Sequence, residues 1–115
     1  MTVSELREIA LELKGVTEDI KWGDHLCFSI GGKMFLITSP DFIPSTSAFK
    51  VPAEQFDEII STEGFSKHSH LGRHNWIHLD DINRLTKKEW EHFINQSYQL
   101  VADRLSNKLK KQLGI

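Results

Sequence analysis

Apolar residues recur at helical spacing in three segments of the chain. The first and third segments open with a capping box, Thr2 with Glu5 and Thr86 with Glu89, and Pro52 opens the second. The apolar faces consist of Leu6, Ile9, Ala10 and Leu13, then Phe56, Ile59 and Ile60, and last Trp90, Phe93, Ile94, Val101 and Leu105. This spacing predicts helices over residues 2–15, over residues 52–64 and from residue 86 to a basic tail at residues 108–111.

Four shorter apolar runs predict β-strands over residues 26–30, 33–38, 47–51 and 76–79. The first two flank Gly31-Gly32, a pair suited to the positive φ angles of a two-residue hairpin turn. Pro40 and Pro44 indicate a loop between the second and third strands. Residues 65–73 show no clear period and are predicted to form a loop as well.

The predicted order of elements is therefore αβββαβα. Four mostly antiparallel strands covered by helices on one face form an α+β fold, a two-layer sandwich. With 115 residues, 39% of them hydrophobic and 26% charged, the whole chain 1–115 is expected to form a single domain. A domain of this size can be a stable monomer, and a weak homodimer is equally compatible with it.

The N-terminal sequence and the single cysteine favour a soluble, cytoplasmic protein. The first residues lack the basic start and apolar stretch of a signal peptide, and no run reaches the roughly 18 apolar residues that cross a bilayer. Cys27 has no second cysteine with which to form an internal disulfide. Because it lies between Leu26 and Phe28, we expect a buried, inert thiol and not a nucleophile.

The charge distribution indicates residues 65–79 as the first place to seek a binding site. Residues 66–115 carry nine Lys or Arg against five Asp or Glu, and five of the six histidines, whereas the preceding part of the chain is acidic. Basic and aromatic side chains interleave there as in a groove for phosphates or bases: Lys67, His68, His70, Arg73, His74, Asn75 and Trp76. The alternative is a polar loop that Trp76 anchors to the core.

No recognisable catalytic centre is present, and the chain is predicted not to be an enzyme. A Ser-His-Asp order, a nucleophile elbow and a phosphate-cradling loop are all absent. Asp80 and Asp81 are adjacent, which favours a turn over an acid–base pair. The histidines between positions 68 and 78 resemble a metal-ligand series, but no cysteine or carboxylate recurs at a diagnostic spacing. We therefore predict no metal site and no cofactor.

Several short motifs together resemble those of the MmcQ/YjbR family. They are Trp22-Gly23, Gly31-Gly32-Lys33-Met34-Phe35, Phe49-Lys50, His70-Leu71-Gly72-Arg73-His74-Asn75-Trp76, Ser97-Tyr98 and Leu100-Val101. The resemblance implies a fold similar to that of frataxin (CyaY-like), and it implies DNA binding, because the family is described as binding DNA through a double-wing arrangement. The chain has His70, Gly72 and Asn75 where the family's Tyr-Leu-Asn-Lys-x-His-Trp run has Tyr, Asn and His.

Three functions follow as hypotheses. The first is a DNA-binding module whose basic side chains contact phosphates while a tryptophan stacks on or braces the site. The residues assigned to it are Lys67, His70, Arg73, His74, Trp76 and Trp22. The second is a protein- or small-ligand-interaction domain with a cleft between residues 65–75 and the hairpin. The third is frataxin-like metal handling by the acids of the first helix, Glu5, Glu8 and Glu12.

Overall fold

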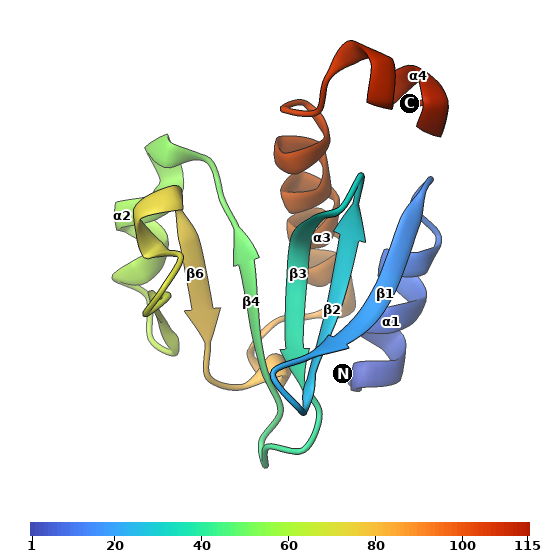
Figure 1. Ribbon diagram of the computed structural model, residues 1–115. Coiled ribbons are helices and arrows are strands. Elements are labelled where there is room, and N and C mark those ends of the chain that lie inside the picture. Colours follow the sequence, from blue (N-terminus) through green and yellow to red (C-terminus); the bar gives the residue numbers. More distant parts are fainter.

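The computed structural model describes all residues, 1–115, and its elements are labelled in Figure 1. The helices are α1 (Val3–Leu11), α2 (Ala53–Ile60), α3 (Lys87–Ala102) and α4 (Asn107–Leu113), with two 3₁₀ helices, η1 (Gly72–His74) and η2 (Ile82–Arg84). The strands are β1 (Val16–Lys21), β2 (His25–Ile30), β3 (Lys33–Ser39), β4 (Thr46–Lys50), β5 (Phe65–Lys67) and β6 (Trp76–Leu79).

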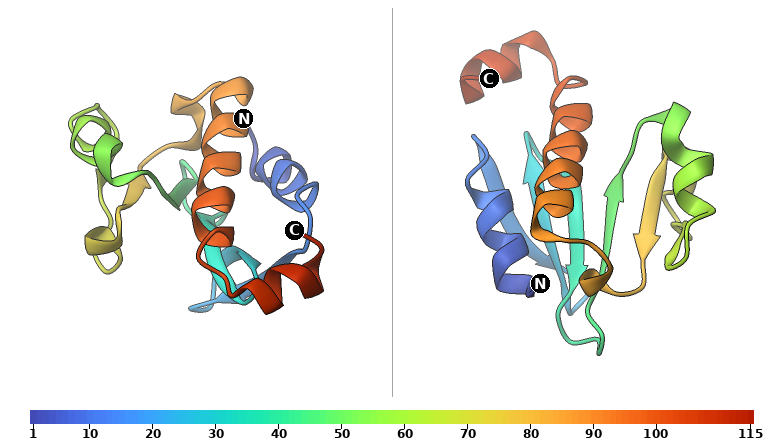
Figure 2. Two further views of the ribbon diagram at one scale, coloured as in Figure 1. Left: turned by 90° about the horizontal axis from the view of Figure 1, so that it is seen from above. Right: turned by 180° about the vertical axis from the view of Figure 1, so that it is seen from behind.

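All six strands form one antiparallel sheet in the order β1-β2-β3-β4-β6-β5. Helices α1, α2 and α3 lie on the same face of this sheet, as the view from behind in Figure 2 shows, while the face toward the viewer in Figure 1 has no helix over it. The predicted α+β class is confirmed. The predicted four-stranded sheet and the order αβββαβα are wrong in detail, because the sheet has two further strands.

The two strands missing from the prediction, β1 and β5, are the edges of the sheet. No residue of β1 is buried, and Thr17, Glu18 and Asp19 form a polar run in its middle. A strand that is solvated on most sides carries little of the alternation from which strands are predicted. Strand β5 has only three residues, so it also lacks a readable period. It occupies part of the segment that was predicted, wrongly, to be all loop.

Ser97 fixes α3 against the sheet at a β-bulge. The register between β2 and β3 shifts after Phe28, so that Phe35 is the extra residue of the bulged strand. The buried hydroxyl of Ser97 donates a hydrogen bond to the carbonyl oxygen of Phe35 (2.6 Å) and accepts one from the backbone N–H of Lys50 (3.0 Å). One side chain of the helix therefore satisfies backbone groups of two neighbouring strands.

The hydrophobic core lies between the sheet and its helices. Eighteen buried residues form this cluster, and the fully buried Trp90 is its largest side chain. The indole N–H of Trp90 donates to the carbonyl oxygen of Ile82 at 2.9 Å, which joins α3 to η2. A second, smaller cluster lies on the opposite face of the sheet and consists of Cys27, Ile37, Ala48 and Trp76.

The chain does not continue as one helix to the basic tail. Helix α3 ends at Ala102, and Ser106 caps a separate helix, α4, by accepting a hydrogen bond from the N–H of Leu109. Leu109 packs against the hairpin turn at Gly31, which has φ of +58° and no space for a Cβ. Helix α4 thus closes one end of the core. None of the helices combines the length and apolar character that crossing a membrane requires.

Candidate functional site

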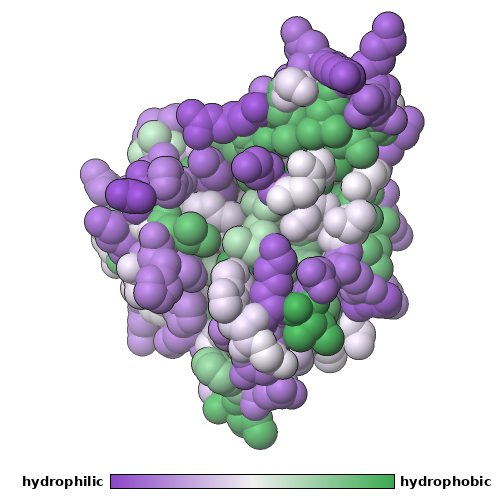
Figure 3. All heavy atoms as spheres, in the orientation of Figure 1, coloured by the Kyte–Doolittle hydropathy of each residue, from purple (hydrophilic) through white to green (hydrophobic).

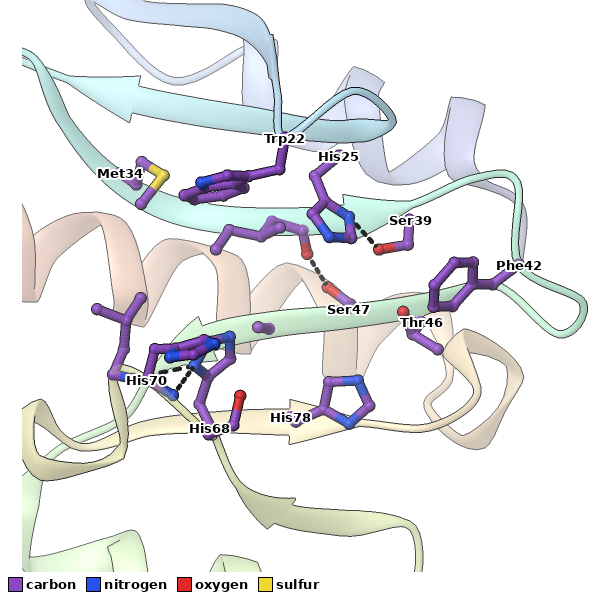
Figure 4. A pocket seen from close by; sticks show the side chains of 14 residues that line it. Trp22, His25, Met34, Ser39, Phe42, Thr46, Ser47, His68, His70 and His78 are labelled. Atoms are coloured by element: carbon purple, nitrogen blue, oxygen red, sulfur yellow. Dashed lines mark hydrogen bonds between the residues drawn. The ribbon is translucent and has the colours of Figure 1, made fainter.

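A pocket of about 570 Å³ occupies the face of the sheet that no helix covers, and Figure 4 shows it from close by. It is lined by Trp22, His25, Met34, Ile37, Ser39, Phe42, Thr46, Ser47, Ala48, His68, Ser69, His70, Leu71 and His78. The volume lies within the roughly 300–1,000 Å³ of typical small-molecule sites. We call this cavity the open-face pocket.

Strand register builds the floor of the open-face pocket. Cys27 pairs with Ile37, Ile37 pairs with Ala48, and Ala48 pairs with His78 across four adjacent strands. Directly opposed residues of antiparallel strands have their side chains on the same face, so this row runs across the open face. Ala48 has the smallest side chain of the row, which leaves space above the middle of the sheet.

Two exposed aromatic side chains stand at the rim of the pocket. Trp22 is 63% exposed and has φ of 53°, a left-handed conformation that is uncommon for a large side chain. Phe42 is 49% exposed and belongs to the β3–β4 loop, which forms the apolar projection at the bottom of Figure 3. The ring of His25 lies between them, with its centroid 5.8 Å from that of Trp22 and 6.3 Å from that of Phe42.

The opposite wall carries three further imidazoles, those of His68, His70 and His78 (Figure 4). The Nδ1 atom of His68 accepts hydrogen bonds from the backbone N–H groups of His70 (3.1 Å) and Leu71 (3.0 Å). An imidazole nitrogen that accepts cannot also carry the proton, so neutral His68 has its hydrogen on Nε2. The loop therefore selects one tautomer of this histidine.

The open-face pocket carries no permanent charge, because none of its lining residues is Lys, Arg, Asp or Glu. Burial lowers the pKa of His68 below its ordinary value of 6.5, and the neighbouring imidazoles of His78, His70 and His25 lower it further. Burial also lowers the pKa of His78, against a smaller opposing effect of Asp80. Both histidines are therefore more readily neutral in the folded protein than in the unfolded chain.

These two histidines predict a loss of stability in mild acid. When the folded state lowers a histidine pKa, the unfolded state binds more protons below the ordinary value of 6.5, so the free energy of unfolding falls as pH falls through that value. We expect urea unfolding to show this fall between about pH 7 and pH 5, and a double variant with His68→Asn and His78→Gln to show a flatter profile.

The two carboxylates with shifted pKa values, Glu18 and Asp80, do not contribute to the change in unfolding free energy between about pH 7 and pH 5. Glu18 and Asp80 have pKa values lowered by hydrogen bonds from Arg7 and Arg84, so their contribution is lost only as pH falls below the ordinary values of 4.5 and 3.8. Equal slopes for the double variant and the unmodified protein above pH 5 would show that the two imidazoles are not the cause.

Only some of the residues that the sequence analysis assigned to the binding site line the open-face pocket in the structure. Trp22 and His70 line the open-face pocket. Trp76 is only 5% exposed and belongs to the small cluster on the same side of the sheet, so its ring braces the site and has no free face for stacking. The basic residues Lys67, Arg73 and His74 are exposed and do not line the pocket; the aliphatic part of Lys67 packs over Gly72.

Several lining residues were not predicted as site residues. His25, Met34 and Phe42 come from the hairpin and the β3–β4 loop, more than twenty positions away from the histidine-rich segment. No local pattern marks them, because the sheet order brings them opposite that segment. His68 was named in the basic and aromatic segment and His78 only in the histidine series, and the pairing of β5 with β6 brings the segment of His68 beside His78.

Glu5 at the start of the first helix and Glu18 of β1 are both engaged in contacts within the protein. Glu5 takes part in the capping box of α1, and Glu18 accepts a bidentate pair of hydrogen bonds from Arg7 at 2.8 and 2.6 Å. No group of three or more His, Cys, Asp or Glu side chains is arranged to hold a metal ion. Buried Cys27, whose pKa is raised by burial, matches the expectation of an unreactive thiol.

A second groove, of about 430 Å³, lies on the helix side of the sheet between α2 and α3. Its lining includes Ile59, Phe65, Leu85 and Phe93 together with Glu63, Arg84 and Glu89. Arg84 is already paired with Asp80 at 2.6 Å. This groove is shallower than the open-face pocket and provides an internal comparison for binding experiments.

The fold and the pocket define a class: a small α+β domain with an antiparallel sheet, helices on one face and a hollow on the other. The chain belongs to the YjbR family, whose model matches residues 11–100. The resemblance seen in the short motifs is therefore confirmed. No match was found among curated proteins.

Solved structures show the same fold. A Deinococcus radiodurans protein described as a DUF419 domain has a TM-score of 0.88 and 23% identity, over 99% of this chain and 88% of that chain. A Pseudomonas syringae protein has a TM-score of 0.72 and 19% identity, over 88% of this chain and 99% of that chain. Identities at this level establish the common fold alone.

Proposed function

We propose that this domain is a non-enzymatic binding module and that the open-face pocket is its binding site for a small, largely apolar molecule. The observation that carries the proposal is the pocket itself: a preformed hollow with an apolar floor, two exposed aromatic rings at its rim and a small number of polar imidazoles and hydroxyls. This combination is the usual composition of a small-molecule site.

The absence of permanent charge supports a small ligand over a nucleic acid. A site that tracks a phosphate backbone is lined with Lys and Arg, and the open-face pocket contains neither. The exposed Trp22 supports the same proposal, because a left-handed backbone at a bulky residue is strained and persists where the surrounding structure, often a functional site, holds it.

DNA binding is the second candidate, and one observation favours it. Lys67, Arg73 and His74 are exposed on adjoining elements, β5 and η1, and form no ion pair, so they are free to contact phosphates. Three such contacts would give a weak affinity that falls steeply with salt. Fluorescence anisotropy with duplex DNA at low salt, before and after Arg73→Ala, measures this function separately from the pocket.

We expect a neutral aromatic probe, naphthamide, to bind the domain and to lose at least about tenfold in affinity when Ala48→Phe fills the pocket floor, since tenfold is about 1.4 kcal/mol. Isothermal titration calorimetry measures the affinity. Ala53→Phe is the matched control, because Ala53 is exposed on α2, away from the pocket.

The naphthamide titrations can also contradict the proposed binding site. If naphthamide binds equally well to the Ala48→Phe variant, or does not bind to the unmodified protein, the open-face pocket is not a small-molecule site of this kind. Ala48→Leu adds a smaller obstruction at the same place and should give an intermediate loss. It covers the case in which the larger side chain disturbs the sheet.

A further inference from the structure

The only ionisable side chains that line the open-face pocket are four histidines, His25, His68, His70 and His78. They come from β2, from the segment after β5 and from β6, and they lie around one hollow in Figure 4. Imidazole is neutral or positively charged and never negative. Any charge that this pocket acquires near neutral pH is therefore positive.

His68 presents a hydrogen-bond donor whose direction is set by the protein. Its Nδ1 is occupied by the N–H groups of His70 and Leu71, which leaves Nε2–H as the free polar group of the ring. The ring of His25 is also held in place, because its Nδ1 lies 2.7 Å from the hydroxyl oxygen of Ser39, a contact that either tautomer of the ring can make. A pocket with an oriented N–H donor and no carboxylate is suited to a ligand that accepts hydrogen bonds.

Two acids lie near this set, but neither of them lines the pocket. Asp24 is 3.7 Å from His25 but lies outside the pocket lining. Asp80 lies beyond His78 and is bound by Arg84 at 2.6 Å. The buried Cys27 beneath the floor has a raised pKa, so it stays a neutral thiol. A protonated His25 has Asp24 as its partner, whereas the wall formed by His68, His70 and His78 has no carboxylate in the pocket lining.

We propose that the ligand class of the open-face pocket is a small aromatic carboxylate, with its ring against the Trp22, Met34 and Phe42 side and its carboxylate against the wall of His68, His70 and His78. The proposal rests on the pocket being the binding site and names the chemistry that it selects. A charge-assisted hydrogen bond from imidazolium to carboxylate is stronger than one between neutral groups.

The proposal makes binding dependent on pH. The proton is expected at His78, because the Nδ1 atom of His68 accepts two backbone N–H groups and His68 therefore serves as a neutral Nε2–H donor. In the empty pocket, burial disfavours protonation of His78. A bound carboxylate supplies the missing negative charge and favours the protonated form, so that binding takes up protons. The carboxylate should then bind more tightly at about pH 6 than at about pH 8.

Two probes of nearly equal shape, naphthoate and naphthamide, test this inference by calorimetry. We expect naphthoate to bind at least about tenfold more tightly than naphthamide at pH 6, a difference that shrinks at pH 8. Repeating the titrations in buffers of different ionisation enthalpy should show proton uptake with naphthoate alone. Because both probes share the same ring system, a difference between their affinities reports on the carboxylate group.

His68→Asn is the most informative variant. Its side-chain oxygen can still accept the two loop N–H groups, while the Nε2–H donor is removed. The preference for naphthoate should fall in this variant while the affinity for naphthamide stays the same. His92→Asn, on the exposed face of α3, is the control and should change neither.

The outcomes separate the inference from the proposed function. If both probes bind the pocket with equal affinity, or naphthamide binds more tightly, the carboxylate inference is overturned and the pocket remains a ligand site. If neither binds, both proposals fail. A naphthoate preference that survives His68→Asn and His78→Gln together would also overturn the inference, because the charge would then come from elsewhere.

Discussion

Replacing Trp90 by alanine is expected to lower the free energy of unfolding by about 3–5 kcal/mol, the usual cost of removing a large buried aromatic side chain. Trp90 is fully buried and packs edge-on against Phe49, with ring centroids 5.6 Å apart. Its loss would leave a cavity between α3 and the sheet and would also leave the carbonyl oxygen of Ile82 without its donor. Urea unfolding followed by far-ultraviolet circular dichroism measures the change.

Trp90→Phe is the matched control for this prediction. Phenylalanine keeps much of the apolar volume but cannot donate to Ile82, so we expect a smaller loss, about 1–3 kcal/mol, from the unsatisfied carbonyl and the partly filled space. A loss for Trp90→Ala as small as that for Trp90→Phe would mean that the core relaxes to fill the cavity. In that case Trp90 would not organise the helix layer as described.

Ser97→Ala is expected to lower the free energy of unfolding by about 3 kcal/mol, although the substitution removes a single oxygen atom. The carbonyl of Phe35 and the N–H of Lys50 would both lose their partner next to the β-bulge, and each unsatisfied buried group costs roughly 1–3 kcal/mol. Thermal and urea unfolding of the variant measure this effect.

Ser66→Ala provides the comparison, because Ser66 is exposed on the edge strand β5 and makes no side-chain hydrogen bond. We expect a change within about 0.5 kcal/mol there. If Ser97→Ala were equally neutral, water or a backbone shift would have to satisfy the two groups. The hydroxyl would then not be what fixes α3 against the bulged strand.

Most of the fold could be predicted from the sequence because its main elements carry strong local signals. The capping boxes at Thr2 and Thr86 are present as predicted, and the Gly31-Gly32 turn joins β2 to β3. The two edge strands could not be predicted, because a solvated or very short strand has no burial period. The break between α3 and α4 was missed because helical spacing continues through Leu105 and Leu109, while Ser106 as a cap was given no weight.

The candidate site could be predicted only in part, since it depends on contacts between distant segments. Of the residues assigned to the site from the sequence, His70 of the histidine-rich segment and Trp22 line the pocket. The position of Trp76 was harder to predict, because its ring looks equally suited to stacking or to burial until the register of β4 and β6 is known. His25 and Phe42 carry no local signal, and only the folded sheet brings them to the same hollow.

The most direct test of the open-face pocket as the binding site is a methyl nuclear magnetic resonance titration of the whole chain with naphthamide. If the open-face pocket is the binding site, we expect saturable chemical-shift changes at the methyl groups of Met34, Ile37, Ala48 and Leu71. We expect no change at Ile59 and Leu85 in the groove between α2 and α3. Shifts gathered at Ile59 and Leu85, or no saturable shift at Ala48, would contradict this expectation.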